Sequence, residues 1–120
     1  MTKTQLFVFA LAAASCAHAA SQIPDPAQTD GDKYKVILEN EQVRVLRYTD
    51  HPGEKTHLHH HPQFVIYALD DFKRRLTLAD GKVMEREFKA GDVAFMPDQA
   101  HIGENIGTTN TEVLLVELKP

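Results

Sequence analysis

The fold of this chain is decided by two segments, Gly53-Glu-Lys-Thr-His57-Leu-His59-His60-His61-Pro62 and Gly91-Asp-Val-Ala-Phe-Met-Pro97-Asp-Gln-Ala-His101. In an extended strand successive side chains point to opposite faces, so His59 and His61 share one face and His60 points the other way. Two imidazoles on one face, joined by His101 from another strand, give three nitrogen ligands suited to a divalent transition metal. The pattern therefore predicts a metal site.

The composition indicates one small globular domain, with 120 residues of which 42% are apolar and 25% charged. The formal net charge is −4 at pH 7, and the longest run of lysine and arginine residues is the three residues Lys73-Arg74-Arg75. This charge pattern argues against nucleic acid or an anionic membrane surface as a partner.

The N-terminal residues 1–19 are predicted to be a signal peptide. Lys3 precedes the short apolar stretch Leu6–Ala14, and Ala17-His18-Ala19 offers small residues to a signal peptidase. We expect cleavage after Ala19 and export to the periplasm or outside the cell. Cys16 offers an alternative as a lipoprotein acceptor, which would tether the chain to a membrane. With cleavage after Ala19 the mature chain has no cysteine, hence neither a disulfide nor a cysteine nucleophile.

Residues 20–33 are polar and contain proline, so we expect a flexible leader before a single β-barrel domain at 34–120. From residue 34 short β-type segments alternate with turn signals, which is typical of an antiparallel sandwich or barrel. Asp80-Gly81 predicts a type I′ hairpin. The expected strands are Lys35–Glu39, Gln42–Thr49, Lys55–His61, Gln63–Leu69, Lys73–Ala79, Val83–Phe88, Asp92–Met96, His101–Asn105 and Glu112–Leu118.

The first segment resembles the first motif of the cupin superfamily, in which a glycine, five residues and His-x-His come in that order. Gly53, His59 and His61 fit it, and Pro62 follows as it often does in that family.

The second segment is similar to the second cupin motif: Gly91, Pro97, His101 and Asn105 have its order and nearly its spacing. The resemblance extends over Tyr34–Leu118. It implies an all-β fold, an antiparallel jelly-roll barrel with its site at the barrel mouth, and it favours a homodimer.

One departure from the family pattern is the missing glutamate of the first motif, which should fall at Val65 or Ile66. The resemblance then leaves a reduced site of His59, His61 and His101 for one divalent Fe, Mn, Ni or Zn ion. Three neutral imidazoles leave the ion its full double charge, which favours chelating anions. The further candidates, as extra ligands or as residues supporting the ligands, are His57, Gln63 and Asn105.

The pocket candidates are Val65, Tyr67 and Phe95. Leu76, Leu78 and Met96 are further candidates for the pocket wall, and the alternative for such residues is ordinary core packing. Phe64, Ile66 and Ala68 are expected on the face opposite the histidines, packed against the other sheet or at a dimer interface. An arginine pointing inward would hold a substrate carboxylate by a two-pronged contact. The candidates are Arg44, Arg47, Arg74, Arg75 and Arg86.

Three functions are compatible with these residues. The first is an exported metal-dependent enzyme of oxygenase type that acts on a small chelating organic acid or diketone, as fold-level analogy suggests. The second is a non-catalytic cupin that binds a small molecule or a metal. The third is a metal-assisted isomerase, for which the sequence offers no identifiable acid/base pair. No residue can be assigned a catalytic role from the sequence.

Overall fold

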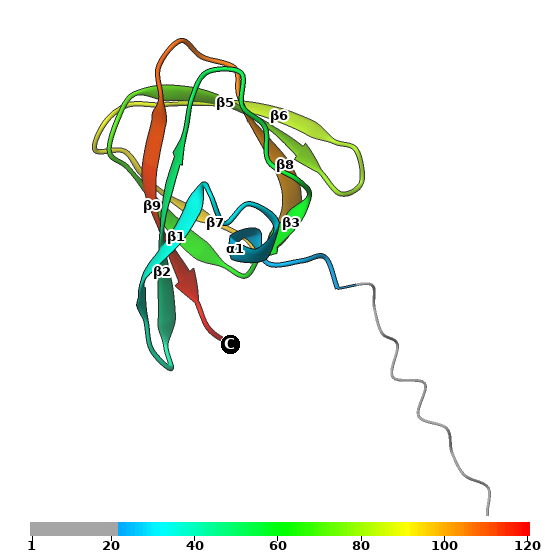
Figure 1. The fold of residues 1–120 in the computed structure, drawn as a ribbon, viewed down its shortest axis with the longest axis vertical. Helices are drawn as coiled ribbons and strands as arrows, with labels where there is room; N and C mark the ends of the chain where they lie inside the picture. The colour runs from blue at the N-terminus through cyan, green and yellow to red at the C-terminus, as the bar shows by residue number, and fades with distance from the viewer. Residues whose placement is uncertain (1–21) are drawn as a thin grey trace, which may run out of the picture.

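A computed structural model describes residues 22–120, so the predicted signal peptide and Cys16 lie outside the described residues (Figure 1). This part of the chain folds into two antiparallel sheets and one short helix, which confirms the all-β prediction. One sheet has the order β1-β2-β9-β4-β7 and the other β3-β8-β5-β6. The elements are α1 (Pro26–Thr29), β1 (Tyr34–Glu39), β2 (Val43–Asp50), β3 (His59–His61), β4 (Phe64–Ala68), β5 (Phe72–Leu78), β6 (Val83–Phe88), β7 (Val93–Met96), β8 (Gln99–Asn105) and β9 (Thr111–Leu118).

Most strands begin and end within two residues of the predicted bounds, and β3 is the main exception. It spans only His59–His61, while Lys55 forms an isolated bridge with Glu104 of β8. The motif glycines Gly53 and Gly91 have φ of 85° and 89°, a conformation that a Cβ disfavours. They close the turns that precede the motif strands, as the sequence predicted.

The hairpin between β5 and β6 forms where Asp80-Gly81 predicts it, but the prediction of a type I′ turn is wrong. Gly81 has φ 89°, whereas no non-glycine residue between 22 and 120 has positive φ. The amide of Gly81 donates to the carbonyl of Leu78 at 2.9 Å. The loop therefore has a single left-handed residue, because one glycine after an ordinary turn already reverses the chain.

The interior is formed by alternate residues of both sheets, and here the predicted parity of β4 is wrong. Phe64, Ile66 and Ala68 are buried inside the barrel, not on the face opposite the histidines. β3 and β4 lie in different sheets, and the bend at Pro62-Gln63 between them shifts the alternation by one residue. As a result His61 and Phe64 both face inward, with ring centroids 4.8 Å apart.

The segment 22–33 was expected to be a flexible leader, but in the structure it holds α1 and packs on one side of the barrel. Asp25 caps α1 by accepting from the amide of Ala27, and the amide of His60 donates to the carbonyl of Pro24. Asp30 is buried. These contacts place the segment beside β3 (Figure 1). No helix within residues 22–120 has the length and apolar character needed to cross a membrane.

Candidate metal centre

Three histidines meet inside the barrel, as the two motifs predicted. His59 and His61 lie on β3, and His101 of β8 pairs directly with His59 across the sheet. Their exposed fractions are 0%, 1% and 5%, and one ring nitrogen from each lies within 4.8 Å of the others. His60 points away from the cluster and contacts Asp98 on the surface. The alternation predicted for this strand therefore holds.

Each histidine of the cluster donates its Nδ1–H to a different acceptor. His59 donates to the carbonyl of His57 at 2.9 Å, His61 to Glu117 Oε2 at 2.8 Å and His101 to Gln99 Oε1 at 2.8 Å. A hydrogen bond at one ring nitrogen fixes the tautomer and leaves the other nitrogen with a free lone pair. All three Nε2 atoms are thus available as ligands.

The Nε2 atoms of His59 and His61 are only 3.0 Å apart. Two unprotonated nitrogens at this distance would repel each other, so either one of them carries a hydrogen or a cation lies between them. The hydroxyl of Tyr34 donates to one of them, His59 Nε2, at 3.2 Å. A cation shared by the nitrogens removes this repulsion, so the residues present fit a divalent metal ion with three histidine ligands and open positions.

Burial keeps two of these imidazoles neutral. It lowers the pKa of His59 to about 4, with the neighbouring His61 acting in the same direction. Burial also holds the pKa of His101 far below its ordinary 6.5, again with help from His61 and His59. A metal ligand must be unprotonated, so near neutral pH these two side chains are ready to bind an ion.

Glu117 on β9 is a functional candidate that sequence reasoning missed. Its carboxylate is buried and accepts from both His61 and Arg44, the latter at 2.6 Å. Burial alone would raise the pKa of Glu117, but these two partners hold it below the ordinary value. The signal was present in β9, where Thr111, Val113, Leu115 and Glu117 form the buried face. A carboxylate on an otherwise inward face predicts a buried partner.

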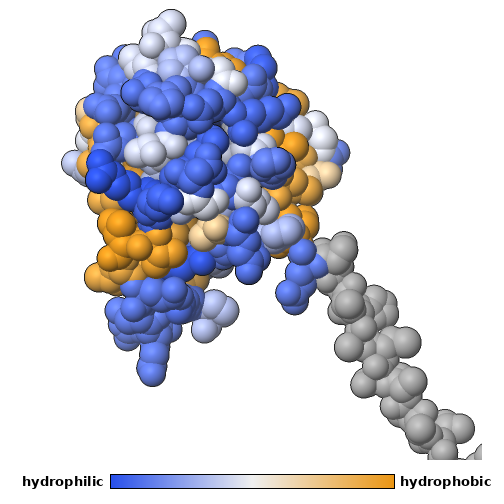
Figure 2. Space-filling view, in the orientation of Figure 1, coloured by the Kyte–Doolittle hydropathy of each residue, from blue (hydrophilic) through white to orange (hydrophobic). Residues whose placement is uncertain are grey.

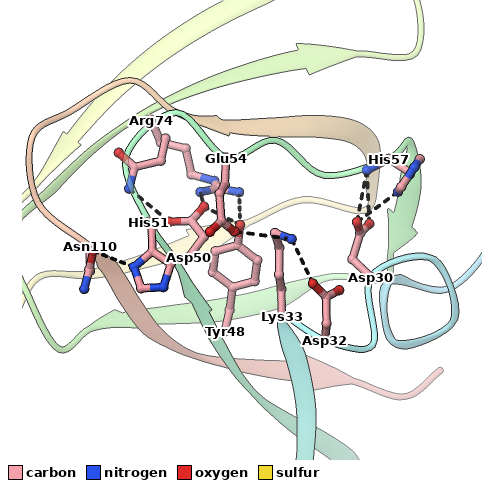
Figure 3. A network of polar contacts seen from close by, with 11 residues as sticks. Asp30, Asp32, Lys33, Tyr48, Asp50, His51, Glu54, His57, Arg74 and Asn110 are labelled. Carbon is pink, nitrogen blue, oxygen red and sulfur yellow. Dashed lines mark hydrogen bonds and ion pairs between the residues drawn. The ribbon is translucent and has the colours of Figure 1, made fainter.

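Figure 3 shows a second buried group of polar residues, Arg74, Tyr48 and Asp50. Tyr34 lies between this group and the cluster, because its ring centroid is 4.5 Å from that of Tyr48 and its hydroxyl contacts His59. Arg74 reaches across Gly103, where a Cβ would stand 2.4 Å from its Nη2, and donates to Asp50 Oδ2 at 2.8 Å. Its guanidinium also donates to the Tyr48 hydroxyl and lies 4.6 Å from the Tyr48 ring centroid. Arg74, one of the candidate inward arginines, is thus already paired.

The three supporting candidates have different positions. The His57 side chain is 79% exposed and turned toward Asp30, although its carbonyl holds His59. Gln63 is exposed in the bend after β3. Asn105 is buried at the far end of β8, where it bonds Asp50 and the carbonyl of Thr109. None of the three side chains joins the cluster.

The pocket candidates Val65, Tyr67 and Phe95 do not line the interior, and this prediction needs correction. Tyr67 is 41% and Phe95 59% exposed. The parity change after His61 turns the β4 position of Tyr67 outward, and Phe95 belongs to the neighbouring strand β7. Val65 pairs with Phe95 on the same outer face. Ile66 is the inward residue at the place of the missing glutamate.

The barrel encloses a cavity of about 40 Å³ that opens toward solvent. His61 and His101 belong to its wall, together with Arg86 of β6. The other lining residues are Tyr34, Tyr48, Phe64, Ile66, Phe72, Arg74, Leu76, Phe88, Met96, Thr111, Val113 and Leu115. The residues around the cluster are thus mostly aromatic and aliphatic.

Comparison with known proteins shows which of them share this fold. No protein-family model matches the chain, and no curated protein matches it. Several solved structures, however, match this chain in fold. A cupin domain from Bordetella pertussis Tohama I superposes with a TM-score of 0.66 at 22% identity, covering 72% of this chain and 92% of that one.

Two further solved structures have a similar fold. An uncharacterized conserved protein with a double-stranded β-helix domain from Klebsiella pneumoniae has a TM-score of 0.55 and 28% identity, covering 70% of this chain and 74% of that one. A cupin family protein from Methanocaldococcus jannaschii has a TM-score of 0.58 and 18% identity, covering 71% and 77%.

Fold and site together define a small β-barrel protein with a buried three-histidine cluster. The chain has the fold of the cupin superfamily, as its two motifs predicted.

Proposed function

We propose that this chain is an exported cupin that binds one divalent Fe, Mn, Ni or Zn ion through His59, His61 and His101. The ion would serve an oxygenase-type reaction on a small chelating organic acid or diketone. The observation that carries the proposal is the common orientation of the three imidazoles: every Nδ1 has an oxygen acceptor, which leaves the three Nε2 atoms as the ligand atoms for the ion.

The residues around the cluster have separate tasks in this proposal. A bound divalent ion supplies positive charge that attracts a chelating anion and stabilises negative charge developing on oxygen. Glu117 and the carbonyl of His57 keep two of the ligands oriented. Tyr34 offers a hydroxyl donor beside His59. The apolar wall restricts the access of water.

The metal site is tested by elemental analysis of the purified protein and three alanine variants. His59→Ala and His61→Ala should each lose the roughly one ion per chain that the unaltered protein holds, whereas His60→Ala should retain it. Equal metal loss in all three variants would contradict the proposed ligand set. If the ion is iron, oxygen consumption with candidate organic acids and diketones then tests the oxygenase reaction.

A second candidate is a non-catalytic cupin that binds a small molecule or a metal. Among the described residues that line the cavity, none is Asp or Glu. This lining favours simple binding over a metal-assisted isomerase, which needs an acid/base pair close to its substrate. Recovery of an unchanged ligand, with no oxygen consumed, would favour the binding function.

Export is part of the proposal and has its own test. We expect a fusion expressed in a bacterium to appear in the periplasm or the medium with an N-terminus at Ala20. A lipid-modified N-terminus at Cys16 would instead mean a membrane-tethered lipoprotein, and an intact Met1 in the cytoplasm would exclude export.

A second copy of the chain is the proposed macromolecular partner. The hairpin of β1 and β2 projects from the barrel and carries apolar surface (Figures 1 and 2). β1 is an edge strand on which Val36, Ile37 and Leu38 are all exposed. Pairing of β1 with its copy would satisfy that open edge. Light scattering should give a dimer, and Ile37→Glu should give a monomer.

A further inference from the structure

The cavity beside the histidine cluster has a further ionic group at the far edge of the same sheet, because the order β3-β8-β5-β6 places Arg86 two strands away from His101. His61 and His101 line one part of this space and Arg86 another. The volume of about 40 Å³ holds roughly three water-sized groups. A ligand that fills it is therefore small, and any longer part must extend toward the open side where Arg86 stands.

The position of Arg86 follows from the alternation along β6. Met84 and Phe88, two residues to either side, pack against the core, so Arg86 shares the inward face. β6 is an edge strand and does not pair with β7, although the two follow each other in the chain. The Arg86 stem thus lines the cavity, while the residue as a whole remains exposed to solvent.

Arg86 differs from the other arginine that lines the cavity. Arg74 is bound to Asp50 and stacked on Tyr48. Within residues 22–120, Arg86 has neither an ion pair nor a side-chain hydrogen bond. Its neighbour Glu85 points to the outer face and pairs with Arg75. The guanidinium of Arg86 is therefore free to bind a ligand.

The charges of the interior show what kind of ligand would be bound. Of the three buried carboxylates among the described residues, Glu117 and Asp50 are paired with Arg44 and Arg74, and Asp30 contacts His57. An ion held by neutral imidazoles keeps both of its charges, and Arg86 adds one more at the opening. An anion is the species that balances this excess, and a guanidinium binds carboxylates through two parallel hydrogen bonds.

The strand register separates the two positive positions. His101 pairs with Leu78, and Arg86 pairs with Arg74, which comes four residues earlier in β5. Four residues of a strand span about 13 Å, and β8 and β6 lie two strand spacings, about 9–10 Å, apart because β5 stands between them; the long arginine side chain covers part of this separation. A ligand that reaches both positions needs an acidic group at each end of a short chain.

We propose that Arg86 is the residue that selects the substrate, and that the substrate is a small organic acid with two acidic ends. One end would chelate the ion at the histidine cluster, the other would form a two-pronged contact with Arg86, and the middle would pack on the apolar wall. This inference rests on the proposed metal site.

The test uses the cobalt(II)-loaded protein, whose visible spectrum reports binding at the metal, and a pair of matched probes. Glutarate and its monoamide, glutaramate, differ only in the second charge. In the unaltered protein glutarate should bind about tenfold or more tightly than glutaramate, because hydrogen bonds to charged groups contribute that much. In Arg86→Gln the two affinities should become equal.

Arg75→Gln is the matched control, because it removes the same charge from the outer face of the adjacent strand. The Arg75→Gln variant should bind glutarate in preference to glutaramate as strongly as the unaltered protein does. The Arg86→Lys variant should keep part of this preference. An unchanged preference in Arg86→Gln, or no binding of succinate, glutarate or adipate to the unaltered protein, would overturn the inference while leaving the metal site intact. Failure to take up cobalt(II) would overturn the proposed function and the inference with it.

Discussion

Glu117 Oε2 lies 2.8 Å from His61 Nδ1, and both side chains are almost completely buried. The hydrogen bond joins β9 of one sheet to β3 of the other, so it links the two halves of the barrel at the candidate metal site. A carboxylate behind a ligating histidine orients the ring and raises its basicity. This pair therefore supplies the site with a negative charge that the motif glutamate does not.

Glu117→Gln should weaken metal binding about tenfold to a hundredfold without unfolding the protein. Glutamine can still accept from His61, but it lacks the charge that favours the His61 tautomer and pairs with Arg44. Competition with a chromophoric chelator for zinc(II) measures the change. Glu112→Gln on the outer face of the same strand is the control, and equal weakening in both variants would contradict this role.

Asp30→Asn should lower both stability and metal affinity, because Asp30 fastens the segment before β1 to the ligand-bearing strand (Figure 3). Its carboxylate accepts from the His57 amide at 3.0 Å, and the His57 carbonyl in turn holds His59. Loss of a charged acceptor at a buried position costs about 1–3 kcal/mol. Urea unfolding measures the cost, and Asp32→Asn, at an exposed position, should be neutral.

Ile66→Glu should tighten metal binding, whereas Val65→Glu should not. Ile66 lines the cavity together with two of the histidines, and Val65 faces outward. A carboxylate at position 66 would neutralise half the charge of a bound ion, although its burial should lower the stability of the metal-free protein. Calorimetric titration with zinc(II) compares the variants. Tighter binding in Val65→Glu alone would mean that the inward and outward faces of β4 are exchanged.

The metal-free protein should lose stability as the pH falls from about 6.5 toward 4. The folded-state pKa of His59 is lowered to about 4 from 6.5, and that of His101 is lowered as well. In this interval the unfolded chain therefore binds protons that the folded chain does not. Each such histidine reduces the free energy of unfolding by up to about 1.4 kcal/mol per pH unit.

Urea unfolding in the presence of a chelator, at several pH values between 7.5 and 4.5, measures this slope. His59→Gln removes one of the two titrating groups, so its pH dependence should be shallower than that of the unaltered protein. A stability that does not change over this interval would mean that the histidines are protonated equally in both states.

The sequence by itself determined the fold class and the three clustered histidines. Alternation along each short strand is a local property, so it separates His59 and His61 from His60 without any knowledge of the fold. The glycines of the two motifs have positive φ for an equally local reason. The order and spacing of the motifs then indicated the cupin fold.

Only the tertiary structure decided which residues surround the cluster. Glu117 is 56 residues from His61 in the chain, and Tyr34 is 25 residues from His59, so these contacts exist only once the sheets have formed. The parity of β4 also depends on the fold, because the chain changes sheets at Pro62-Gln63 and the alternation shifts there. Local patterns describe one strand at a time, whereas the site is formed by strands that meet across the barrel.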